Sequence, residues 1–94
     1  MNDFSNLNQL PSEIKQLIVT GQTLVNDVKD KMKDRSYSFD LTSKMQLKSD
    51  CKEVEKYIKF ISKGKTKEKY VKQLDVSIVR LRTTFEGLIE FFTR

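Results

Sequence analysis

Residues 71–92 read VKQLDVSIVRLRTTFEGLIEFF, and their apolar side chains recur at alternating steps of three and four residues. This spacing is the heptad pattern of a helix that buries one side. A lone helix cannot keep such a stripe in water, so it must pack against other helices. We call this stripe the C-terminal seam; its members are Val71, Leu74, Ile78, Leu81, Phe85, Leu88 and Phe92.

A first upstream helix is predicted over about residues 11–34. Pro11 suits its first turn, and Glu13 complements the positive end of the helix dipole. Gly21 falls inside the apolar stripe, where its small size indicates close packing against a neighbouring helix. The stripe itself consists of Ile14, Leu17, Ile18, Leu24, Val25, Val28 and Met32.

A second helix is predicted over about residues 40–62, with Asp40 or Ser38 as its N-cap. We expect Lys48, which interrupts the apolar stripe, to cover the edge of the core with its stem. The expected stripe consists of Leu41, Met45, Cys51, Val54, Ile58 and Ile61, widened by Leu47, Tyr57 and Phe60.

Gly64 is a suitable residue to end the second helix, and Thr66 is a suitable cap for a third helix over about residues 66–92. Three long helices joined by short connections pack as antiparallel neighbours. We therefore expect an all-α protein: an antiparallel three-helix bundle that forms a single helical domain over residues 1–94. A helical hairpin that forms a homodimer through the C-terminal seam is the alternative.

Apolar residues also gather at both ends of the chain. Phe4, Leu7 and Leu10 recur every third residue and are compatible with a short extra N-terminal helix. Phe91 lies off the C-terminal seam, so apolar groups near the C-terminal end cover more than one face of the helix. Either the N-terminal segment covers residues 85–92, or that end contacts a partner or a second copy of the chain.

The composition argues against catalysis and against a cofactor. The chain has no histidine, and this removes the commonest general base and the commonest metal ligand. Cys51 lies on the apolar side of its helix, where a small buried hydrophobe is expected and not a nucleophile. The acidic residues lie off the apolar stripes and beside lysines, which is typical of surface ion pairs. We expect no enzyme, no cofactor and no metal site.

The sequence also bears on location. The longest apolar run is Leu17 to Val19, far too short for a transmembrane segment. The first residues lack the basic start and apolar run of a signal peptide, and a single cysteine suits a reducing compartment. We expect a cytoplasmic protein.

The positive charge is concentrated in residues 56–72. This segment carries a net charge of +6, whereas the whole chain carries +5. Such a segment suits phosphates, an acidic protein surface or anionic lipid, but it is also what an ordinary solvated turn contains. The partner-binding candidates are these lysines together with Phe91: Lys56, Lys59, Lys63, Lys65, Lys67, Lys69 and Lys72.

These observations favour a small, non-enzymatic, intracellular binding protein, a regulator, inhibitor or adaptor that acts through helix surfaces on a protein partner. A nucleic-acid-binding accessory protein that uses residues 56–72 is one alternative, and a membrane-surface or immunity-type protein is another. Small basic helical bundles occur among bacteriocin-immunity proteins, phage-encoded inhibitors and subunits of nucleic-acid machines. No residue motif of these groups matches the chain, so the analogy transfers no function.

Overall fold

The computed structural model describes residues 11–34, 37–65 and 67–93. It contains three helices: α2 spans Ser12–Lys33, α3 spans Leu41–Ser62 and α4 spans Glu68–Thr93. These bounds differ from the predicted ones by at most two residues. The predictions for Phe4, Leu7, Leu10 and the Thr66 cap lie outside the described residues.

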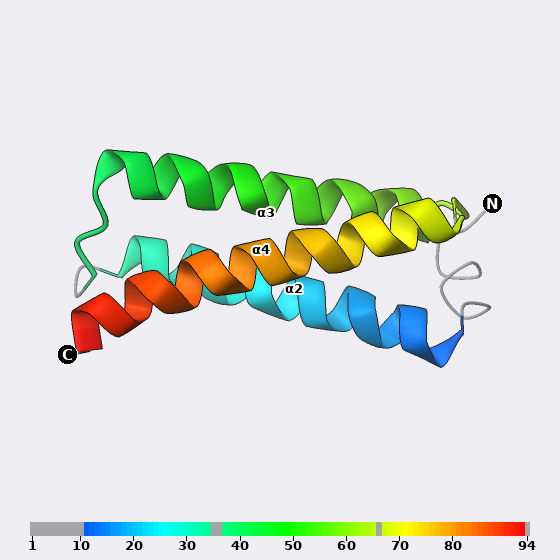
Figure 1. The fold of residues 1–94 in the computed structure, drawn as a ribbon, viewed down its shortest axis with the longest axis horizontal. Helices are drawn as coiled ribbons and strands as arrows, with labels where there is room; N and C mark the ends of the chain where they lie inside the picture. Colours follow the sequence, from blue (N-terminus) through cyan, green and yellow to red (C-terminus); the bar gives the residue numbers. More distant parts are fainter. Residues whose placement is uncertain (1–10, 35–36, 66, 94) are drawn as a thin grey trace.

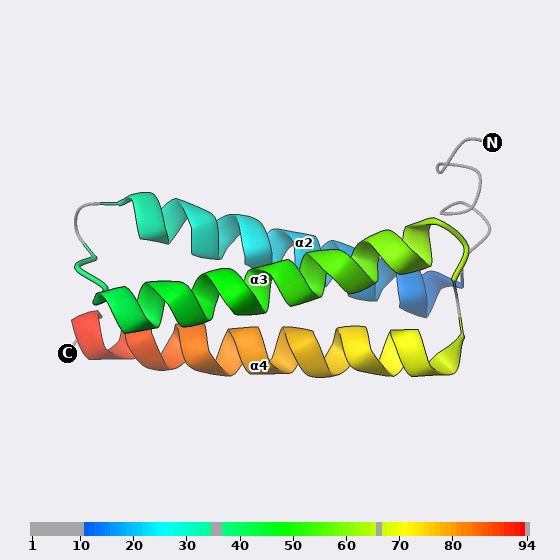
Figure 2. The same cartoon turned by 90° about the horizontal axis from the view of Figure 1, so that it is seen from above.

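The three helices lie lengthwise beside one another, and each runs antiparallel to the next in the chain (Figures 1 and 2). The α3–α4 turn and the start of α2 share one end of the bundle. The α2–α3 connection and the C-terminal end of α4 share the other (Figure 1). The principal extents are 44 × 22 × 20 Å, so the two ends are well separated. The expected antiparallel three-helix bundle is confirmed.

The core forms where one stripe from each helix meets the others. The C-terminal seam supplies its centre, since Leu74, Ile78, Leu81 and Phe85 are all buried and Leu81 is fully inaccessible. The side chain of Phe92 lies outside the described part of the structure. The other helices contribute Ile18, Val25 and Val28 from α2, and Leu47, Cys51, Val54, Ile58 and Ile61 from α3.

The predicted stripe of α3 was wrong in its first two turns. Leu41 and Met45 are 74% and 62% exposed, whereas Leu47 is fully buried. The buried stripe continues back from Cys51 to Leu47 with the same spacing, so Leu41 and Met45 belong to a second stripe on the outer face of the helix. Lys48 lies on that outer face too and is exposed, so it does not cover the edge of the core.

Asp50 is a second departure from the sequence analysis, which placed all the acidic residues off the apolar stripes. Its side chain is only 3% exposed. Oδ1 accepts a hydrogen bond from Gln46 Nε2 at 3.0 Å, while Oδ2 is buried and has no hydrogen-bond partner among the described residues. An incompletely satisfied buried carboxylate opposes folding, because burial removes its hydration without replacing it.

Three local features match their expected roles. A Cβ added to Gly21 would lie 3.1 Å from Ile78 Cδ1 and 3.2 Å from Ile58 Cδ1, so this glycine permits close packing of all three helices. Gly64 has φ 97°, a left-handed conformation that glycine adopts without strain at a helix end. Asp40 caps α3: Oδ1 accepts a 3.1 Å hydrogen bond from the Ser43 backbone N–H.

No helix in the described part of the chain combines the length and the apolar character that crossing a membrane requires.

Candidate functional site

The structure brings the lysines of residues 56–72 together at one end of the bundle. Three of them lie on α3 or at its C-cap, and the others lie on the turn and at the start of α4 (Figure 1). We call this set the lysine end: Lys56, Lys59, Lys63, Lys65, Lys67, Lys69 and Lys72. All seven side chains are exposed.

Three half-buried aromatic rings lie among these lysines. The rings of Tyr57 and Phe60 meet edge to face, with centroids 5.9 Å apart, and Phe60 meets Tyr70 of α4 in the same way at 5.6 Å. Because Phe60 lies on α3 and Tyr70 lies on α4, these ring contacts hold the two helices together next to the turn. We call the three rings the aromatic base of the lysine end.

The ammonium groups of three lysines lie over these rings. Lys65 Nζ is 4.9 Å from the centre of the Phe60 ring, Lys56 Nζ is 5.1 Å from that of Tyr57, and Lys69 Nζ is 5.1 Å from that of Tyr70. Each such cation–π contact contributes about 0.5–1 kcal/mol at an exposed site. The contacts restrain long side chains that would otherwise sample many rotamers.

The positive charge of the lysine end is scarcely neutralised within the protein. Among the described residues, its ion pair joins Lys72 Nζ to Glu68 Oε1 at 3.9 Å, and both side chains are mostly exposed. Exposed pairs of this length contribute little. The ammonium groups of the lysine end are therefore available to an anionic partner.

Phe91, the remaining predicted site residue, lies at the opposite end of the bundle. It is 72% exposed and borders a hollow of about 350 Å³ lined by Phe39, Leu88 and polar residues of the α2–α3 connection and the start of α3. The structure does not bring Phe91 and the lysines into one site. Phe39, which the sequence analysis assigned only to a connection, is itself buried.

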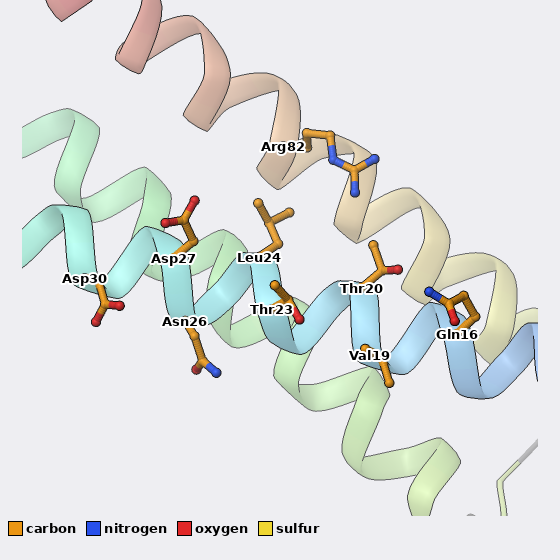
Figure 3. A pocket seen from close by; sticks show the side chains of 9 residues that line it. All are labelled: Gln16, Val19, Thr20, Thr23, Leu24, Asn26, Asp27, Asp30 and Arg82. Atoms are coloured by element: carbon orange, nitrogen blue, oxygen red, sulfur yellow. The ribbon is translucent and has the colours of Figure 1, made fainter.

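A further hollow, an open surface of about 620 Å³, lies along α2 and faces Arg82 of α4 (Figure 3). Asp27 and Leu24 point toward α4, whereas Asn26 and Asp30 point away from it, so these groups do not converge on one ligand (Figure 3). In the described part of the chain, no group of three or more cysteine or acidic side chains is arranged to hold a metal ion.

Cys51 lies in the core of the bundle as a free thiol. Burial, and then the negative charge of Glu55, raises the pKa of the Cys51 thiol to about 11. The thiolate is the nucleophilic form, so almost none of the reactive species exists at neutral pH.

The sequence analysis missed Lys48 and Lys52, which are exposed on α3 outside the lysine end. The available signal was their spacing, since Lys48, Lys52, Lys56, Lys59 and Lys63 follow one another at steps of three or four residues. Lys48 was instead assigned to the apolar stripe that was thought to run through Leu41 and Met45.

Comparisons of the chain with protein-family models, with curated proteins and with solved structures found no match.

Proposed function

We propose that this chain is a non-enzymatic binding protein, a regulator, inhibitor or adaptor, that holds a macromolecular partner at its lysine end. The observation that supports this most is the concentration of seven exposed lysines at one end of a packed bundle, with one long, exposed ion pair among them in the described structure. A partner with closely spaced negative charges would be attracted to this end and held by it.

The aromatic base of the lysine end supports the same proposal. A lysine on a plain surface loses considerable side-chain freedom when it binds. Lys56, Lys65 and Lys69 are already restrained over rings, so less freedom remains to be lost on binding.

The absence of catalysis is part of this proposal. The chain has no histidine, and the pKa of its single thiol is raised to about 11 within the core. General acid–base catalysis and nucleophilic catalysis near neutral pH need a group that titrates near the working pH. Binding is therefore the better account of this surface.

Heparin, a polyanion, provides the test. The lysine-end variant K63Q/K65Q/K67Q/K69Q lowers the net charge from +5 to +1. The control K31Q/K33Q/K44Q/R82Q makes the same change in charge away from the lysine end. We expect the lysine-end variant to elute from a heparin column at clearly lower salt than the control. Its free energy of unfolding should fall by no more than about 2 kcal/mol, because Lys65 and Lys69 each lose a ring contact that contributes about 0.5–1 kcal/mol.

Equal elution of the two variants would contradict the proposal, because it would mean that total charge and not its placement governs retention. A large loss of stability in the lysine-end variant, without loss of retention, would also contradict it.

The exposure of Phe91 supports a second candidate, an apolar contact with a protein partner or a second copy of the chain. Such a contact buries apolar surface and responds little to salt. Sedimentation of concentrated protein would then give a mass above that of the monomer at both low and high salt, and F91A would restore the monomer. A monomer at all concentrations would exclude the homodimer.

A further inference from the structure

The lysine end continues along the outer face of α3 as a row of lysines. Lys48, Lys52, Lys56, Lys59 and Lys63 follow one another at steps of four, four, three and four residues, and all five are exposed. Those steps keep the five side chains on one side of the helix. From Lys48 to Lys63 the row extends about 22 Å at 1.5 Å per residue. We call these five residues the lysine row.

The acidic residues Glu53 and Glu55 border this row but pair with other helices: Glu55 lies three residues after Lys52 and four before Lys59, and it lines the same hollow as Lys59. Glu53 Oε2 accepts a hydrogen bond from Arg80 Nη1 of α4 at 3.2 Å, and Glu55 Oε2 accepts one from Lys29 Nζ of α2 at 3.4 Å. Asp50 is buried. No described carboxylate lies within ion-pairing distance of a lysine of the row, so the row keeps an excess of positive charge although Glu55 lies beside it.

The residue type of the row distinguishes among partners. Protein–protein interfaces are depleted in lysine and enriched in arginine and aromatic residues, so five lysines in a row are unusual for a protein contact. Lysine acts instead as a point charge that binds a phosphate without the bidentate geometry that arginine uses to read guanine. Contacts of this kind position a protein on nucleic acid without reading its sequence.

A membrane surface fits the row less well. Proteins that lie on membranes add buried apolar area to their electrostatic attraction. The large apolar side chains exposed on α3 are Leu41 and Met45, and both precede the lysine row. Stacking of single-stranded bases is also disfavoured, because ring–ring contacts and ammonium groups already engage Tyr57, Phe60 and Tyr70.

We infer that the lysine row and the lysine end together bind the phosphate backbone of double-stranded nucleic acid, without sequence preference. This inference rests on the proposed function and names the partner class. A duplex carries one negative charge per about 1.7 Å of its axis, so each lysine of a 22 Å row can reach a phosphate. The row lies on a long helix within a packed bundle and requires no rearrangement to present its charges.

The test is fluorescence anisotropy of a labelled duplex of about 20 base pairs, longer than the row at 3.4 Å per base pair. If the five lysines of the row alone each neutralise one phosphate, the dissociation constant should rise about 500-fold between 50 and 200 mM salt, and phosphate contacts from the rest of the lysine end would increase this rise. Two duplexes of unrelated sequence should bind alike. A tenfold preference for one sequence would overturn the absence of sequence preference.

Lys48 and Lys52 test the inference separately from the proposed function, because both lie outside the lysine end. The variant K48Q/K52Q should flatten the slope of log affinity against log salt by about 1.8, since each phosphate contact contributes about 0.9. The control K33Q/R82Q removes the same charge from other surfaces and should flatten it far less. Equal slopes for the two variants would overturn the role of the lysine row.

Two further arms test the partner class. Vesicles containing anionic lipid and the acidic polymer polyglutamate should each bind much more weakly than the duplex at the same salt. Tight binding to either one without binding to the duplex would overturn the nucleic-acid inference. The proposed function would survive that result if heparin retention still depended on the lysine end.

Discussion

The two faces of α3 have the same periodicity and opposite chemistry. The inner face places Leu47, Cys51, Val54, Ile58 and Ile61 in the core at steps of four, three, four and three. The outer face continues from Leu41 and Met45 into the lysine row at steps of three and four as well. One helix therefore carries two regular stripes, of which one holds the bundle together and the other faces solvent.

This comparison explains why spacing alone does not identify a core. A step of three or four residues finds side chains that share a face, but both faces of a helix satisfy it. Leu41 and Met45 are apolar and correctly spaced, yet they align with lysines and not with Leu47. Which stripe is buried depends on the neighbouring helices, so it depends on tertiary packing.

The largest expected effect compares one substitution on the two faces of α3. Leu47→Ala removes a fully buried side chain and should lower the free energy of unfolding by about 2–5 kcal/mol, as should Leu81→Ala on α4. Leu41→Ala removes an exposed side chain and should change it by less than about 0.5 kcal/mol. Urea denaturation measures the free energy of unfolding of each variant. Similar decreases for L41A and L47A would mean that Leu41 is buried and would contradict its place on an exposed outer face.

The next effect concerns Cys51, on the inner face. The folded protein keeps the thiol protonated up to a pKa of about 11, whereas the thiol of the unfolded chain loses its proton near its ordinary pKa of 9.0. The contribution of the neutral thiol is therefore complete below pH 9 and is lost as the pH rises through 11, a fall on the order of 2 kcal/mol.

Stability measured against pH should accordingly decline less steeply in C51A than in the wild type over this range. Native Cys51 should also react slowly with a thiol reagent at neutral pH and rapidly in denaturant. Fast labelling of the native protein would place the thiol at the surface and contradict its position on the inner face.

Much of the fold could be predicted because the C-terminal seam is long and uninterrupted. Gly64 and the Asp40 cap also follow from local chemistry, since a positive φ favours glycine and an aspartate side chain satisfies a free helix N–H. Leu41 and Met45 were misplaced because their environment is set by other helices. Asp50 was missed for the same reason, since nothing in the residue itself indicates burial.

The candidate site was predictable in part. The charge of residues 56–72 is visible in the sequence, but its relation to the aromatic rings depends on the turn that brings Tyr70 against Phe60. The sequence shows the lysine row only as a regular spacing of lysines. It does not show that the neighbouring acidic residues Glu53 and Glu55 pair with Arg80 and Lys29 of other helices. Such pairing requires a tertiary structure.

A smaller effect, of opposite sign at the two positions, is expected when a buried glycine and an exposed glycine are each replaced by alanine. Gly21→Ala gains about 1 kcal/mol in helix propensity but crowds Ile58 and Ile78, and overpacking costs about 1–3 kcal/mol. We expect a net loss of up to about 2 kcal/mol. Gly87→Ala meets no atom within 4 Å and should raise stability by about 0.5–1 kcal/mol. Thermal unfolding of the two variants measures whether each substitution raises or lowers stability. A rise in stability for G21A equal to that for G87A would contradict close packing at Gly21.

The central claim is that the lysine row serves binding and that its members, apart from Lys56 with its ring contacts, contribute nothing favourable to folding. Lysines three or four residues apart repel one another by about 0.2–0.5 kcal/mol per pair at low salt. The variant K48Q/K52Q/K59Q/K63Q relieves five such pairs, counting Lys44 with Lys48, and leaves Lys56, with its ring contacts, in place. It also removes the two favourable spacings of Glu55 with Lys52 and Lys59, which offset part of the relief. The direct measurement is its free energy of unfolding at low and high salt. We predict a gain of about 1 kcal/mol over the wild type at low salt that fades as salt screens the repulsion, whereas a loss of more than about 1 kcal/mol at every salt concentration would contradict the claim.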